Sequence, residues 1–277
     1  MLAALGTVLA AAGPAWAAPT GFTDTTLSTK DQVLSLDLGG SAAGAVLPST
    51  TGLPTNTDDQ KFSPAGVDLG VNDTDLTTCT LVRINTTTGA GALVGSTGVT
   101  NCGGSGRPRI AFTPDGRLWL VNNGTQFFQV DPTTGLATAA GTLPTAIDGL
   151  VGSCGGDLLA TTSDATNGAL IRFSPASPST PTTIGHLGIP TQGANLALTG
   201  LDFAADGTLW ALRQNVTAGA MESYTINTTS GAATLARANT MAANLSGGLA
   251  IAPLSCPPPP AAPTPATVVV SAPRFTG

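Results

Sequence analysis

Few side chains in this sequence are able to do acid–base or metal chemistry. Only 9% of the 277 residues are charged, and the chain has one histidine and four cysteines. A serine–histidine–aspartate triad would have to use His186, whose neighbours read as an exposed outer strand, and nothing like a nucleophile elbow is present. Zinc sites need several histidine or cysteine ligands, and the cysteines lack C-x-x-C spacing. The sequence therefore argues against both chemistries.

Carboxylates are the remaining candidates for catalysis or metal binding. A glycosidase needs two of them at a defined separation, and calcium needs several oxygen ligands. Asp115 and Asp206 precede glycines and are expected to be turn residues, whereas Asp148 and Asp202 lie in apolar stretches. Asp148 and Asp202 are thus the two carboxylates that can face a shared interior space, provided that the fold brings their segments together.

The overall charge excludes one class of partner. The net charge is −6, and the only lysines are Lys30 and Lys61. A nucleic-acid-binding protein needs a basic face that displaces counterions from phosphates. We therefore expect no nucleic-acid partner, and anionic membrane surfaces are disfavoured for the same reason.

A repeated motif shows which elements must position these residues. Phe112-Thr-Pro-Asp-Gly-Arg-Leu-Trp119 returns as Phe203-Ala-Ala-Asp-Gly-Thr-Leu-Trp210, with a third copy at 62–66 and a degenerate one at 150–159. A second motif follows, as in Gln129-Val-Asp-Pro-Thr-Thr-Gly135, and occurs five times in all, at intervals of about 48 residues. Both motifs predict tight turns between strands, so each period provides four short antiparallel strands.

Such a period is typical of one blade of a β-propeller. A lone sheet of this size cannot bury both faces, but sheets in a ring cover one another. Residues 246–254 read as a first strand, and 25–47 as the second to fourth strands of the same blade. We therefore predict an all-β propeller over 22–254, with five four-stranded blades, closed by pairing the C-terminal strand with the N-terminal blade. Residues 49–61 are expected to be a long loop; if they hide strands, six blades are the second choice.

The inner strands of such a ring begin at the mouth of a central channel, where propellers commonly contact ligands. The repeat places a mixed set of arginine, aspartate and hydroxyl side chains along these strands: Arg107, Arg109, Asp148, Thr199, Asp202 and Ser246. We predict that they bind a small polar or anionic ligand. The alternative is that they are solvated loop residues.

The ends of the chain and its cysteines indicate export. Residues 1–17 read as the apolar part of a signal peptide ending in an A-x-A cleavage pattern, which predicts a secreted, periplasmic or cell-surface protein without a membrane span. Four cysteines are then expected to form two disulfides, with free buried thiols as the alternative. The strand register favours Cys79–Cys102 and Cys154–Cys256. Residues 255–277 are predicted to be a proline-rich linker or tail.

The two motifs together resemble the repeats of exported bacterial β-propellers, including uncharacterised secreted domains and the lactonase-like and NHL-like groups. The lactonase-like resemblance implies a metal held by Glu, Asn and Asp at the inner strands. The only glutamate, Glu222, is expected in a loop or outer strand, which departs from that pattern.

Three functions remain open at this point. The first is a non-catalytic, monomeric scaffold or binding module without a cofactor, whose partner is a small polar ligand or a protein. The second is a hydrolase or lyase that uses channel carboxylates, with calcium as a possible cofactor. The third is a fragment of a larger cell-surface protein.

Overall fold

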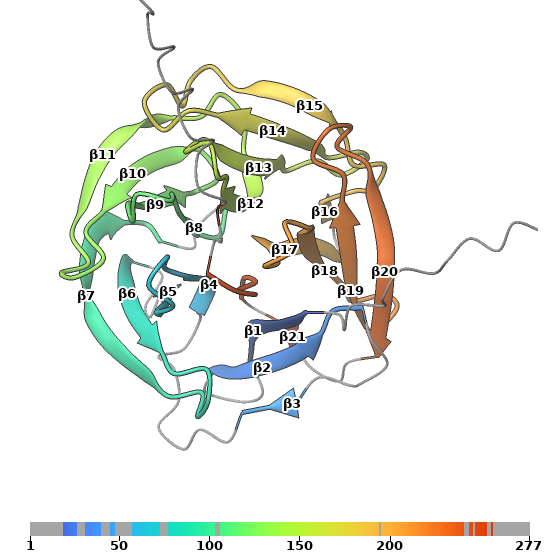
Figure 1. The fold of residues 1–277 in the computed structure, drawn as a ribbon, viewed down its shortest axis with the longest axis horizontal. Helices are drawn as coiled ribbons and strands as arrows, with labels where there is room; N and C mark the ends of the chain where they lie inside the picture. Colours follow the sequence, from blue (N-terminus) through green and yellow to red (C-terminus); the bar gives the residue numbers. More distant parts are fainter. Residues whose placement is uncertain are drawn as a thin grey trace, which may run out of the picture.

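Five β-sheets surround a central axis in the computed structural model of the chain (Figure 1). The structure describes residues 19–26, 31–39, 45–47, 57–72, 77–102, 106–193, 195–240, 244–245, 247–253 and 256. The predicted signal peptide and, except for Cys256, the predicted tail lie outside these residues. In the part that is described, no helix is long and apolar enough to cross a membrane.

Each sheet is one blade of a five-bladed propeller, as predicted. Blade 1 contains β21 (Asn244–Leu245), β1 (Thr20–Thr26), β2 (Asp31–Asp37) and β3 (Ala45–Val46). Blade 2 contains β4 (Thr57–Phe62), β5 (Asp68–Asn72), β6 (Thr78–Ile84) and β7 (Gly91–Thr100). Blade 3 contains β8 (Arg109–Phe112), β9 (Leu118–Asn122), β10 (Gln126–Val130) and β11 (Ala137–Thr142).

The last two blades follow the same order. Blade 4 contains β12 (Ile147–Gly152), β13 (Leu158–Thr162), β14 (Ala169–Phe173) and β15 (Thr182–His186). Blade 5 contains β16 (Gln192–Gly193), β17 (Leu196–Phe203), β18 (Leu209–Asn215), β19 (Ala220–Ile226) and β20 (Ala233–Thr240). Blade 5 therefore has one short strand more than the predicted four.

The ring closes through the two ends of the chain, as predicted. β21 pairs antiparallel with β1, and Ala250 forms a further bridge with Phe22. In Figure 1 the label β21 stands next to the blue strand β1, with which β21 pairs. This pairing completes blade 1 and protects the edge of β1.

Apolar clusters between neighbouring blades hold the ring together. Leu69 and Leu81 of blade 2 pack with Phe112 of blade 3, and Trp119 and Trp210 of the first motif lie in further clusters of this kind. Cys79 and Cys102 join the blade 2–blade 3 cluster and are disulfide-bonded. The second disulfide links Cys154 to Cys256, so both pairs match the prediction.

The repeated turns form as expected and also contact the next blade. The glycine of each first-motif turn has a left-handed φ, for example 83° at Gly116. The turn of the second motif docks on a glycine in the outer strand of the preceding blade. A Cβ added at Gly95 would lie 2.1 Å from the Thr134 carbonyl oxygen, and one at Gly185 would lie 1.9 Å from that of Ser230. Only glycine allows this approach.

The prediction of a long loop at residues 49–61 is wrong for its second part. Residues 57–61, within the predicted loop 49–61, belong to β4, the innermost strand of blade 2. Asp58, Asp59, Gln60 and Lys61 are all buried there. Hydrogen bonds and an ion pair inside the ring stabilise Asp59 and Lys61, although the sequence made this segment look like an exposed loop.

Candidate functional site

A polar pocket of about 330 Å³ lies at the mouth of the central channel, where β8 and β12 begin and β17 passes. Three of the six predicted site residues line it, namely Arg107, Arg109 and Asp148. The remaining lining comes from the segment before β8, the loop after β9, the start of β12 with the residue before it, the end of β13, the segment around β16, and β17: Gly106, Asn123, Gly124, Ala146, Ile147, Ser163, Thr191, Gln192, Ala197 and Leu198.

Inner-strand bulges determine which side chains reach this region. The pairing register shifts at Asp58 in β4, at Asp148 in β12 and at Thr199 in β17. A bulge inserts one residue into a strand and re-aims its side chain, often beside functional sites. Three blades therefore present their bulged residue at corresponding places in the ring, and one of these residues, Asp148, lines the pocket.

Arg109 connects three blades at the floor of the pocket. It is 3% exposed, and its guanidinium donates to the carbonyl oxygens of Asp58 (2.7 Å) and Leu198 (3.4 Å). Its Nε–H has no acceptor among the described residues. Burial lowers the pKa of Arg109, although an arginine stays charged at neutral pH. The pocket therefore has a fixed cation whose Nε–H is unused by the described residues.

Arg107 and Asp148 provide charge nearer to solvent. The Arg107 Nε lies 3.9 Å from the Asp58 carboxylate, and the Arg107 side chain is 41% exposed. Burial raises the pKa of Asp148, and the positive charge of Arg109, together with the nearby Ser163 and Thr191, opposes this effect. One Asp148 carboxylate oxygen, Oδ2, has no hydrogen-bond partner in the part of the chain that is described.

Asn123 adds a second unused acceptor to the same pocket. Its backbone is left-handed, with φ of 49°, in the turn between β9 and β10. Its side-chain Oδ1 is buried and accepts no hydrogen bond from any described residue. The pocket therefore combines a cationic donor with two buried acceptors, and such groups in native proteins normally find a partner, whether protein, water or ligand.

The structure separates the other predicted residues from this pocket. Thr199 is fully buried in β17 and does not line it. Asp202 lies nearer the end of β17, where it accepts the backbone N–H of Phe203 (2.9 Å) and of Ile251 (2.8 Å). Burial raises the pKa of Asp202 to about 7. Ser246 lies outside the described residues.

A buried cluster around Lys61 was missed by the sequence analysis. The Lys61 ammonium donates to the Asp59 carboxylate (2.9 Å) and to the carbonyl oxygens of Gln60 (3.0 Å) and Leu249 (2.9 Å). Asp59 also accepts the N–H of Ile110 from blade 3 (2.9 Å). These bonds link blades 1, 2 and 3. The repeat contained a signal, because Phe62 precedes its turn as Phe112 does, which places an inner strand before it.

The metal pattern implied by the lactonase-like resemblance does not fit these residues. Glu222 lies on β19, the strand before the outermost one, and not in a loop or outer strand as expected. It is buried and binds Arg213, Asn215 and Tyr224. It is therefore an internal hydrogen-bond partner of blade 5, remote from an inner-strand metal position. His186 is exposed on the outer strand β15, as predicted.

No protein-family model matches the sequence, and no curated protein matches it significantly. Among solved structures, the fold is similar to a chain of a nidogen–laminin complex, with 12% identity, a TM-score of 0.52 and coverage of 84% of this chain and 98% of that chain. A Bacteroides thetaiotaomicron protein of unknown function has 10% identity and a TM-score of 0.51, over 85% of this chain and 65% of that one. The periplasmic gluconolactonase of Pseudomonas aeruginosa has 17% identity and a TM-score of 0.45, over 81% and 68%. At these identities the likeness shows the propeller fold alone.

Proposed function

We propose that this protein is an exported propeller that binds a small polar anion at the mouth of its channel. One observation carries the proposal: a cationic donor, Arg109 Nε, and two buried acceptors, on Asn123 and Asp148, lack partners around one polar pocket. Arg107 adds a second, more exposed cation to the same pocket. A ligand with an anionic group and at least one hydroxyl or amine donor would satisfy both kinds of atom.

Export is part of this proposal and has its own support. The chain holds two disulfides, which persist in oxidising compartments, and the segment 1–17 has the pattern of a signal peptide. A secreted, periplasmic or cell-surface location agrees with both. The expectation of a monomer stays a prediction, which light scattering of the purified protein would test.

Ligand binding is tested by thermal shift and calorimetry with hydroxy acids such as glycolate and glycerate. A ligand at about 100 times its Kd stabilises the folded state by about 2.7 kcal/mol. We expect Arg107→Gln and Asp148→Asn each to weaken binding at least about tenfold. The matched control is Arg117→Gln, because Arg117 is exposed in a turn of blade 3 outside the pocket.

Two results would contradict the proposal. If no small anion shifts the melting temperature, or if the control weakens binding as much as the pocket variants do, the channel mouth is not the site. Acid released from an ester or lactone probe, and lost in Asp148→Asn, would replace the binding role with hydrolysis. A rise of several degrees with Ca²⁺ would favour the metal-dependent form of that alternative.

A further inference from the structure

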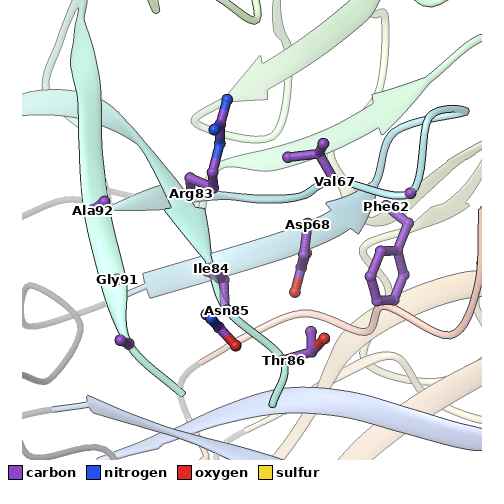
Figure 2. Close-up of a pocket in the computed structure, with 11 residues that line it drawn as sticks. Phe62, Val67, Asp68, Arg83, Ile84, Asn85, Thr86, Gly91 and Ala92 are labelled. Atoms are coloured by element: carbon purple, nitrogen blue, oxygen red, sulfur yellow. The ribbon is translucent and has the colours of Figure 1, made fainter. Parts of the chain in front are cut away.

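A second pocket, separate from the channel mouth, opens on blade 2 and has a volume of about 490 Å³ (Figure 2). The start of β5, the end of β6, the turn that follows β6 and the start of β7 form it. Its walls include apolar atoms of Phe62, Val67, Ile84 and Ala92. It lies next to the seam between blades 1 and 2, which has a small buried apolar cluster of Val33, Val82 and Ile84.

One acidic side chain is buried at this pocket. Asp68 is 2% exposed, and neither carboxylate oxygen has a hydrogen-bond partner among the described residues. Its cross-strand neighbours are Phe62 and Ile84, so apolar side chains flank it on both sides. Figure 2 shows the carboxylate pointing between Phe62 and Thr86. Two acceptor atoms therefore lie behind an apolar rim without a donor from the described protein.

The nearby charged groups do not supply that donor. The three hydrogen bonds of the Lys61 ammonium go to Asp59, Gln60 and Leu249. Arg83 lines the pocket, but Figure 2 shows its guanidinium directed away from Asp68. Asp59 and Asp202 add negative charge, and burial together with these charges raises the pKa of Asp68 well above its usual value despite the opposing effect of Lys61.

We infer that this pocket binds a primary ammonium group carried on a short aliphatic stem. The ammonium would donate to both Asp68 oxygens, and the stem would pack on Ile84 and Val67. The face of the Phe62 ring would add a cation–π attraction. A divalent metal ion fits less well, because calcium takes six to eight oxygen ligands and several walls of this pocket are apolar.

The inference is tested with n-butylammonium chloride, followed by the amide NMR shifts of residues around the pocket. We expect saturable binding, at least about tenfold weaker in Asp68→Asn, because a hydrogen-bonded ion pair is replaced by a neutral amide. Binding should tighten as pH rises, because the bound ammonium favours the ionised carboxylate. The neutral probe 1-butanol, which keeps the stem and lacks the charge, should bind more weakly than the ammonium. Asp115→Asn, which alters an exposed turn aspartate, is the matched control.

The design separates this site from the channel mouth and from misfolding. Arg107→Gln should leave butylammonium binding unchanged, so the two proposals can fail independently. If Asp68→Asn proves unfolded by circular dichroism, Ala92→Trp provides a second variant that fills the rim from an exposed position. Absence of saturable binding, equal affinity for 1-butanol, or full binding by Asp68→Asn would each overturn the inference.

Discussion

The buried lysine in the ring offers a sharp test of how the propeller closes. Lys61 is 3% exposed, and each of its three ammonium hydrogens has an acceptor, one of them the Leu249 carbonyl in the closing segment. The substitution Lys61→Met keeps the length of the side chain and removes the charge. It leaves Asp59 buried without its cation and the Leu249 carbonyl without this donor.

The expected cost follows from these losses. Removing one partner of a buried ion pair costs about 3–5 kcal/mol, because the remaining charge is uncompensated. Asp59 keeps two backbone donors, Gln60 N at 3.0 Å and Ile110 N at 2.9 Å, which places the expected loss near the lower end, at about 3 kcal/mol. Urea unfolding of the full chain measures this loss as a lower midpoint with an unchanged slope.

A double-mutant cycle separates the ion pair from general packing damage. Asp59→Asn combined with Lys61→Met should be more stable than Lys61→Met alone, because no isolated charge remains buried. Since Lys61 lowers the pKa of Asp202, the single variant should also raise that pKa, as NMR titration would show. The control Arg117→Met should cost no more than about 0.5 kcal/mol. A loss below about 1 kcal/mol for Lys61→Met, or a double variant less stable than the single one, would refute the reasoning.

Two further predictions concern pH and the contacts between blades. Asp202 has a folded pKa of about 7 against an ordinary value of 3.8, so the folded state binds the proton more tightly. Its contribution to stability should therefore be greatest below about pH 4 and should be lost, by about 4 kcal/mol in all, as the pH rises from there through 7. Asp202→Asn should make the free energy of unfolding, measured with urea at each pH from about 4 to 8, depend less on pH. An unchanged dependence on pH would contradict this. Gly185→Ala should cost about 1–3 kcal/mol in urea unfolding, because its Cβ would overlap the Ser230 carbonyl. Gly155→Ala, whose Cβ has no neighbour nearer than 3.9 Å, should be neutral, and equal losses for the two would argue against the docking contact.

The parts of the fold that sequence predicted correctly are those with local turn chemistry. Asp115 accepts hydrogen bonds within the turn of the first motif, and Asp131 of the second motif accepts the backbone N–H of Thr133 at 2.8 Å. These turns are formed by hydrogen bonds between residues close together in the chain, so they can be recognised from sequence alone. Because each blade contains one copy of the turn, the spacing of the copies indicated the number of blades. The disulfide Cys154–Cys256 followed from the same spacing, because strand order assigns each cysteine to one face of the ring.

β4 could not be recognised from its own residues because its burial depends on the whole ring. Thr57-Asp-Asp-Gln-Lys-Phe62 has no apolar alternation, and the charged groups of Lys61 and Asp59, besides pairing with each other, bond Leu249 and Ile110, which lie far away in sequence. An unpaired copy of this segment would be a solvated loop. Only the position of Phe62 before its turn indicated an inner strand here. That indication comes from comparison with the other copies of the repeat, and not from residues 57–61 themselves.

The candidate site was partly predictable for a related reason. Sequence register placed Arg107, Arg109 and Asp148 at the channel mouth, and all three line the pocket there. It also placed Thr199 at that mouth, where the structure instead buries its side chain. Both Asp148 and Thr199 are bulged residues, and a glycine follows each of them, whereas Asp59 follows Asp58, the bulged residue of β4, so no single residue type marks all three bulges. Because side chains alternate along a strand, one extra residue decides whether the next side chain enters the pocket or the blade interface. The repeat therefore identifies the strand that carries a site residue, but the direction of its side chain depends on strand pairing that the sequence does not display.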